Sequence, residues 1–157
     1  MTDTPDRLAD RLLSEGEKTL QFFNELMPEH WKMEIYTEGS CWSVHQILSH
    51  FVAAESSFAR LVEDILAGGK GTPENFDLDA YNERKVARLN SVAAEDLISR
   101  FSILRSEFAD LVRRMSQDDL AKTGRHPFLG TATLEDIVKL LYRHNQIHVR
   151  EIRRKIG

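Results

Sequence analysis

Hydrophobic residues recur at intervals of three and four along four stretches of the chain, which is the spacing of amphipathic helices. We expect helices over about 5–27, 44–66, 92–115 and 134–155. No stretch shows a convincing alternation of polar and apolar residues, the pattern of a half-buried strand. The pattern therefore predicts an all-α protein.

The residues before these stretches support the predicted starts, because short polar side chains can accept the free N–H groups of a first helical turn. Ser43 and Gln46 have the spacing of a capping box, and Trp42 and Ile47 that of a hydrophobic staple. The predicted N-cap residues are Thr4, Ser43, Ser91 and Thr133.

Amphipathic helices of similar length predict a four-helix bundle, which we expect to form one domain over residues 1–157. The connections 28–42, 68–90 and 116–132 are longer than is usual between bundle helices. The middle connection can extend over about 75 Å, enough to cross from one end of a bundle to the other. This crossover between the second and third helices predicts an up-down-down-up topology. The last connection is expected to contain a short helical turn near 116–121.

Two histidines lie on the predicted core face of the last helix. His144 and His148 are four residues apart, so they share one face, and they lie in line with Ile137, Leu141 and Ile152. Burial of two neighbouring imidazoles is costly unless they form hydrogen bonds or share a cation.

A third histidine could join them. His50 lies at the margin of the apolar face of the second helix, and its depth matches that of His144 and His148 if the two helices run antiparallel. Three neutral imidazoles that leave coordination positions open suit Zn, Ni or Fe(II). The alternative is a set of buried histidines satisfied by hydrogen bonds. His126 is the plausible substitute ligand, whereas His45 lies on the solvated side of its helix.

Composition narrows the class of protein. The chain has 21 Lys and Arg against 25 Asp and Glu, a net charge of −4, so neither nucleic acid nor an anionic membrane is an expected partner. No apolar run approaches the length of a membrane span. One Cys excludes an internal disulfide framework and a Cys-rich zinc site. With a polar start unlike a signal peptide, these features lead us to expect a cytoplasmic protein.

Several motifs resemble those of the DinB/YfiT-like bundle proteins, in order and over nearly the whole chain. They are WSVHQILSH at 42–50 followed by Glu55, FDLDAYN at 76–82, HPFLG at 126–130, and LED at 134–136 leading to His144 and His148. The resemblance implies a four-helix bundle that binds a divalent metal ion through His50, His144 and His148. Members of this family often form homodimers.

The resemblance also implies a range of reactions. Relatives include bacillithiol- and mycothiol-dependent S-transferases and a thiol-dependent maleylpyruvate isomerase, and some carry an acidic residue where His144 stands, which argues against the isomerase reaction here. We expect a metal-dependent S-transferase, or a hydrolase, that acts on a small electrophilic substrate with a low-molecular-weight thiol or water. The alternative is a non-catalytic metal-binding stress-response protein or a dimeric scaffold.

Other residues could assist such a site. Glu151 lies three residues after His148 and could be a general base or orient a ligand; the alternative is a surface glutamate paired with Lys155. Glu55 points away from His50, so we do not expect it to be a ligand. The residues expected near the entrance to the site are Cys41, Trp42, Tyr81 and Asn82.

Overall fold

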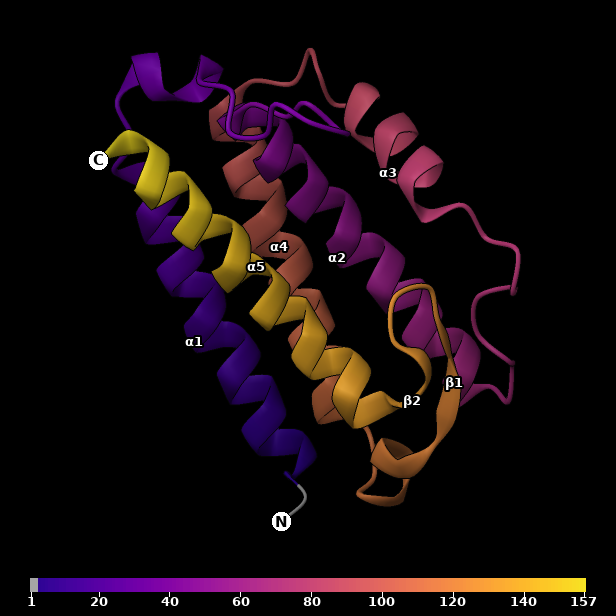
Figure 1. Cartoon of the computed structure of the whole chain (residues 1–157). Helices are drawn as coiled ribbons and strands as arrows, with labels where there is room; N and C mark the ends of the chain where they lie inside the picture. The colour runs from indigo at the N-terminus through magenta and orange to yellow at the C-terminus, as the bar shows by residue number, and fades with distance from the viewer. Residues whose placement is uncertain (1–2) are drawn as a thin grey trace.

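The computed structural model describes residues 3–157 and contains a bundle of four long helices (Figure 1). Figure 1 shows α1 and α5 running in one direction and α2 and α4 in the other, so the predicted up-down-down-up topology is confirmed. No helix among residues 3–157 is long and apolar enough to cross a membrane. The bundle helices are α1 (Pro5–Asn24), α2 (Val44–Leu66), α4 (Ala94–Arg113) and α5 (Leu134–Ile156).

Each of α1 and α2 packs against both α4 and α5, and the buried residues between them form two apolar clusters. One cluster includes Leu12, Phe108 and Leu141, and the other includes Phe51 and Phe101. Helices α2 and α5 are therefore antiparallel neighbours. The predicted site, with His50 on one helix and His144 and His148 on the other, requires this arrangement.

Local signals explain most helix ends. The side chains of Thr4, Ser43 and Thr133 accept backbone N–H groups in the first turns of α1, α2 and α5, which confirms these predicted caps. The first helix ends at Asn24, earlier than expected, because Pro28 cannot continue a helix and instead begins the 3₁₀ helix η1 (Pro28–Lys32).

The predicted cap at Ser91 is wrong. Helix α4 begins at Ala94, and Ala93 occupies the N-cap position without a side-chain hydrogen bond. Residues around Ser91 instead form a turn in which the Val92 N–H donates to the Leu89 carbonyl. Glu95 and Asp96 lie in the first turn of α4, where their negative charges stabilise the helix by interacting with the positive end of its dipole.

The crossover contains a helix that the hydrophobic pattern did not predict. Helix α3 (Leu78–Ala87) lies along the outer side of α2 (Figure 1), and the Asp77 side chain caps it by accepting the Ala80 N–H. Val86 is its single fully buried residue, so α3 lacks the regular apolar stripe by which helices are recognised in sequence.

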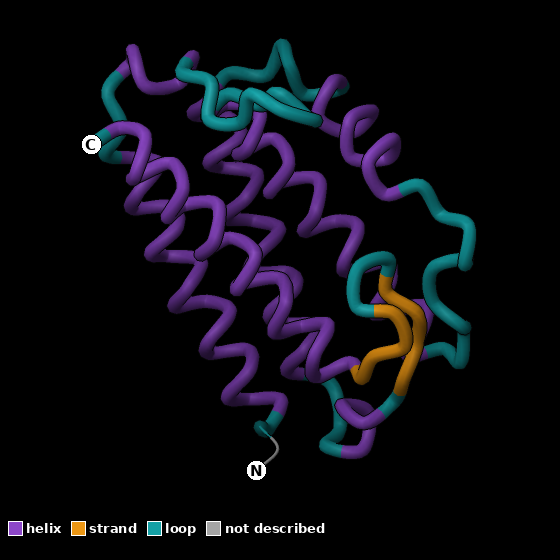
Figure 2. Tube along the Cα trace, in the orientation of Figure 1, coloured by secondary structure: helices purple, strands orange, loops and turns teal. Residues whose placement is uncertain are grey.

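The predicted helical bundle is accompanied by a small two-stranded sheet that the hydrophobic pattern did not indicate. Strands β1 (Thr123–His126) and β2 (Gly130–Thr133) form a short antiparallel hairpin before α5 (Figure 2). Each strand is too short to show a clear alternation. The crossover docks on this hairpin, because Gly71 forms a parallel bridge with Arg125. The expected helical turn near 116–121 is present as the 3₁₀ helix η2 (Asp118–Ala121).

Candidate metal centre

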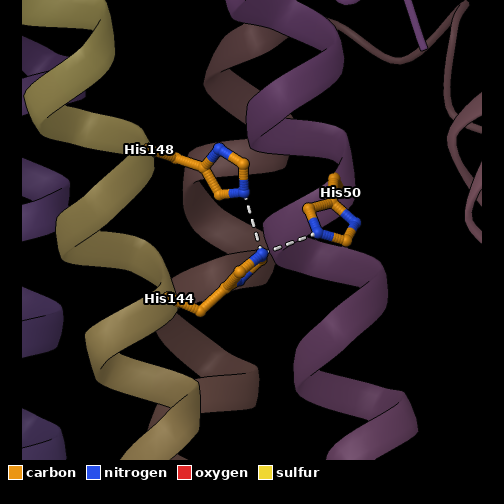
Figure 3. Close-up of side chains that lie close together, drawn as sticks. All are labelled: His50, His144 and His148. Carbon is orange, nitrogen blue, oxygen red and sulfur yellow. Dashed lines mark hydrogen bonds between the residues drawn. The ribbon is translucent and has the colours of Figure 1, made fainter. Parts of the chain in front are cut away.

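Three histidines from two helices converge between α2 and α5, as predicted (Figure 3). The Nε2 atom of His144 lies 3.1 Å from Nε2 of His50 and 2.8 Å from Nε2 of His148. One ring nitrogen from each residue lies within 4.8 Å of the other two. We call these three residues the histidine centre.

The helices determine this convergence. His50 lies two turns beyond the Ser43 cap of α2, and the Trp42 ring lies 4.9 Å from its ring between centroids. His144 and His148 are one turn apart on the facing side of α5, and the Phe51 ring lies 6.0 and 5.8 Å from their rings. Aromatic packing therefore restricts all three imidazoles to this region.

The surroundings keep these histidines neutral. Burial, with a contribution from His148, lowers the pKa of His50 to about 3. Burial also lowers the pKa of His144 well below its usual value, and that of His148 to a lesser extent. At neutral pH each ring consequently carries one nitrogen with a free lone pair, the form that binds metal ions.

Hydrogen bonds among the rings do not fully account for the centre. A neutral imidazole nitrogen is either a hydrogen-bond donor or an acceptor. Nε2 of His144 can therefore form a good hydrogen bond with one neighbouring nitrogen at a time, although Nε2 of His50 and Nε2 of His148 both lie within 3.1 Å of it. Ligand nitrogens around a tetrahedral ion, at the usual Zn–N distance, lie about 3.4 Å apart. The donor set and its spacing therefore fit one divalent ion.

A hydrogen-bonded chain behind the centre determines the orientation of His148. The Tyr36 hydroxyl donates to Oε1 of Glu151 at 2.7 Å and lies 2.5 Å from Nδ1 of His148. Because a phenol has one proton, Nδ1 of His148 must be the donor to the Tyr36 oxygen. The free lone pair of His148 is then on Nε2, which faces the other two histidines.

Glu151 therefore lies behind His148, with Oε1 3.8 Å from Nδ1 of that residue. Within residues 3–157 it forms no ion pair with Lys155, so that alternative is not what the structure shows. Burial and the Glu151 carboxylate raise the pKa of Tyr36, which keeps the phenol protonated. Such outer hydrogen bonds commonly orient metal-binding histidines.

The role of Tyr36 was not predicted from the sequence. This residue lies in the connection between α1 and α2, where the Ile35 and Tyr36 N–H groups both donate to the Trp42 carbonyl. The returning backbone places Tyr36 over the end of α5, 112 residues away from His148 in the chain. No helical spacing signals such a contact.

A cavity of about 500 Å³ adjoins the histidine centre, and His50 and His144 form part of its wall. The wall comes from α2, α3, α5, the crossover and the hairpin. Tyr81 and Asn82 line it, as expected. Trp42 and Cys41 do not, because Trp42 packs on His50 and Cys41 is exposed in the preceding loop.

His126 also lines the cavity but is not part of the histidine centre. Its Nδ1 accepts the N–H groups of Phe128 and Leu129 at 3.0 and 3.2 Å, so its proton is on Nε2. Burial lowers the pKa of His126 to about 4. The neutral imidazole thus holds the hairpin turn as a hydrogen-bond acceptor through Nδ1, and it does not act as a substitute ligand in this arrangement.

Glu55, five residues after His50 on α2, is buried and pairs with Arg105. Its Oε1 accepts from Nε of Arg105 at 2.5 Å, and burial raises its pKa to about 7 against the opposing effect of that guanidinium. Arg105 also donates to the Leu12 carbonyl at 3.0 Å and to Oδ1 of Asn145 at 2.6 Å. The expectation that Glu55 is not a ligand agrees with this geometry.

Comparison with known proteins gives a family and a set of similar folds. The family model described as the DinB superfamily matches residues 5–152. No curated protein matches the sequence. YfiT from Bacillus subtilis, a probable metal-dependent hydrolase with an unusual four-helix bundle topology, is 18% identical with a TM-score of 0.77. That similarity covers 96% of this chain and 84% of YfiT.

Two further solved structures have the same fold. The mycothiol-dependent maleylpyruvate isomerase is 13% identical with a TM-score of 0.71, over 94% of this chain and 59% of the isomerase. The colibactin self-resistance protein ClbS, in complex with double-stranded DNA, is 12% identical with a TM-score of 0.74, over 98% of each chain. At sequence identities this low, the similarity shows a shared fold and does not show a shared activity.

Proposed function

The chain belongs to the DinB superfamily, and we propose that it is an enzyme that depends on one divalent metal ion held by His50, His144 and His148. The observation that carries this proposal is the convergence of three neutral, largely buried imidazoles beside a cavity of about 500 Å³. Zn, Ni and Fe(II) all accept such nitrogen ligands. A cavity of this size is suited to a small organic molecule.

The proposed reaction is the transfer of the sulfur of a low-molecular-weight thiol to a small electrophilic substrate: a carbon–sulfur bond forms, the bond to the leaving group of the substrate breaks, and the thiol gives up its proton. When bound, the ion supplies Lewis acidity and lowers the pKa of a thiol or a water molecule. The sulfur must come from a small molecule, because Cys41 is the one thiol of the chain and is exposed outside the cavity. Hydrolysis is the second candidate, since the same centre would act on water, and YfiT is described as a probable metal-dependent hydrolase.

The residues of the chain have separate roles in this proposal. The three histidines bind the ion, and the apolar cavity wall excludes water from the substrate. Tyr36 and Glu151 keep His148 with its proton on Nδ1. We therefore assign Glu151 a positioning role through Tyr36, in preference to the general-base role considered from the sequence.

Metal analysis of protein purified without a metal-affinity tag tests the centre. We expect about one equivalent of a divalent metal per chain in the wild type, and its loss in His50→Ala and His144→Ala. His30→Ala is the matched control, because His30 lies in η1 outside the centre, and it should keep its metal. Full occupancy in both centre variants would contradict the assignment.

A panel of thiols with an aryl halide, and a panel of esters without thiol, then tests the reaction. A metal-dependent rate with a thiol that disappears in His144→Ala supports the transferase. A rate with esters alone supports the hydrolase, whereas no metal-dependent rate in either panel favours the non-catalytic metal-binding alternative.

Partners and location remain predictions. We expect a homodimer, which sedimentation would test, and a cytoplasmic location. The net charge of −4 still argues against DNA as a general partner, although ClbS was solved with double-stranded DNA. Titration of a labelled duplex at low salt would test this expectation.

A further inference from the structure

The cavity beside the histidine centre has walls suited to an apolar molecule. Phe58 and Leu61 of α2, Phe76 of the crossover and Leu140 of α5 supply apolar side chains to it. Two further hydrophobic residues of the wall remain open to solvent: Phe128 is 75% exposed and Ile147 is 52% exposed. An apolar ligand body would cover part of both side chains, which favours binding.

The polar residues on the α2 and α3 side of this cavity mainly offer hydrogen-bond donors. Nη2 of Arg60 donates to the Tyr81 oxygen at 3.1 Å and to Oγ of Ser57 at 3.4 Å, and Tyr81 and Ser57 lie 2.7 Å apart. We call Ser57, Arg60 and Tyr81 the donor cluster. The Lys85 ammonium lies 5.3 Å from the centre of the Tyr81 ring and adds positive charge.

No carboxylate of residues 3–157 forms an ion pair with Arg60. Asp64 is the one acidic residue on the cavity wall, and its Oδ2 already accepts the Gly71 N–H at 3.1 Å. The guanidinium of Arg60 is therefore a cation on the wall of an apolar cavity without an acidic partner. Arginine in this setting binds carboxylates well, because its planar group offers several donors.

The distance between the two ends of the cavity limits the shape of the ligand. Arg60 is ten residues after His50 on the same helix, which corresponds to about 15 Å along the axis. Both residues line the same cavity. A molecule that reaches both must be elongated, and its middle part must lie against Phe58 and Leu61.

We propose that the cavity binds an elongated apolar molecule with one anionic group, held by the donor cluster, and with its other end directed at the histidine centre. The assignment of that other end as the reacting one depends on the proposed function; the binding mode does not. The substrate class is thus an aryl- or alkyl-substituted carboxylate, distinguished from its neutral analogues by Arg60.

Binding of ω-phenylalkanoates to metal-free protein tests the proposal. Titration calorimetry would compare 4-phenylbutyrate and 6-phenylhexanoate with their primary amides. We expect the carboxylates to bind at least about fivefold more tightly, which corresponds to one exposed ion pair of about 1 kcal/mol. Arg60→Gln should reduce each carboxylate to the affinity of its amide, whereas Arg100→Gln, an exposed arginine on α4, should change neither.

The location of the probe is tested by Ala53→Phe, which places a large side chain on the cavity wall and should weaken acid and amide alike. Circular dichroism verifies that each variant is folded. Equal affinity of acid and amide in the wild type, or no binding of any probe, would overturn the proposal. Metal content measured on the same protein before the metal is removed separates the two hypotheses: absence of a bound metal ion with a retained preference for carboxylates refutes the proposed function alone.

Discussion

A single phenol determines which nitrogen of His148 faces the histidine centre. Tyr36 donates its one proton to Glu151 and so leaves its oxygen as the acceptor for Nδ1 of His148. Without this acceptor, the imidazole could place its proton on either nitrogen and rotate more freely. We therefore expect Tyr36 to increase the affinity of the histidine centre for a metal ion without contacting the ion itself.

We predict that Tyr36→Phe lowers the affinity for the divalent ion by about 10- to 100-fold, the usual effect of removing an outer hydrogen-bond partner. Competition with a chromophoric chelator measures this change. Tyr142→Phe is the control, because Tyr142 lies on α5 away from the centre and packs under Arg11. Unchanged affinity in a folded Tyr36→Phe protein would refute the role of the hydroxyl.

The histidines also make stability depend on pH. Burial lowers the pKa of His50 to about 3 and that of His126 to about 4, from 6.5. Below pH 6.5 the unfolded chain therefore binds more protons than the native protein, and each group removes up to about 1.4 kcal/mol of unfolding free energy per pH unit. Glu55 has the opposite effect, because burial raises its pKa from 4.5 to about 7. Between these two pH values the native protein binds one more proton at Glu55 than the unfolded chain does, which adds to stability as the pH falls.

We predict that the unfolding free energy of metal-free protein is largest near pH 7 and falls as the pH is lowered from 6.5 towards 4. Urea titrations at pH 7, 6 and 5 in the presence of EDTA measure it. In His126→Asn the slope should be smaller, since one of the histidines is removed. A stability that is constant or rises over this interval would show that the histidines are not buried in neutral form.

Individual site residues could be predicted from the sequence only where the regular spacing of a helix determines which side chains share a face. His144 and His148 could be predicted because residues four apart share a helical face, and His50 because its depth matched theirs. Tyr36 and Arg105 could not be predicted, since the first acts from an irregular loop and the second through contacts with three other helices.

Among the elements, the docking of the crossover on the hairpin builds one wall of the cavity. The Arg125 N–H donates to the Lys70 carbonyl at 2.9 Å, and the Thr72 N–H donates to the Arg125 carbonyl at 2.8 Å. Gly71 lies between these bonds with φ of +88°, and a Cβ atom there would lie 2.5 Å from the Arg125 backbone. A side chain at this position therefore has no space.

We predict that Gly71→Ala lowers the unfolding free energy by about 1–3 kcal/mol more than Gly68→Ala. Gly68 also has a positive φ, of +93°, but a Cβ atom there has no heavy atom within 4 Å, so this control isolates the steric effect. Urea unfolding measures both. Equal losses would show that the crossover adapts to a side chain at position 71.

The same elements show why the sequence prediction of the fold was incomplete. Helices with a continuous apolar stripe and a capping side chain were predicted to within a few residues. Helix α3 and the hairpin were missed because they are short and each buries little apolar surface of its own. Helix α3 depends on its contacts with α2, and the hairpin depends on its contacts with α2 and with the crossover at Gly71.

Within the whole molecule, Arg105 connects all four bundle helices. Its guanidinium is on α4 and binds a carbonyl of α1, a carboxylate of α2 and an amide of α5. The residue is 2% exposed and Glu55 is 1% exposed. Loss of one partner of a buried pair leaves the other charge without compensation.

We predict that Arg105→Met lowers the unfolding free energy by about 3–5 kcal/mol. Arg100→Met on the exposed side of the same helix should change it by no more than about 0.5 kcal/mol. Chemical denaturation of both proteins at pH 7 measures the difference. Similar small changes in the two variants would mean that the buried network contributes little to stability.

The position of the histidine centre along the chain has a kinetic consequence. His50 and His144 are separated by 94 positions, so an ion bound between them would close a loop of most of the protein, as a reversible cross-link does. Such a link cannot form before the last helix has joined the second. Forced separation of α2 from α5 would then have to break metal–ligand bonds, and the unfolding rate would fall with rising concentration of free metal ion.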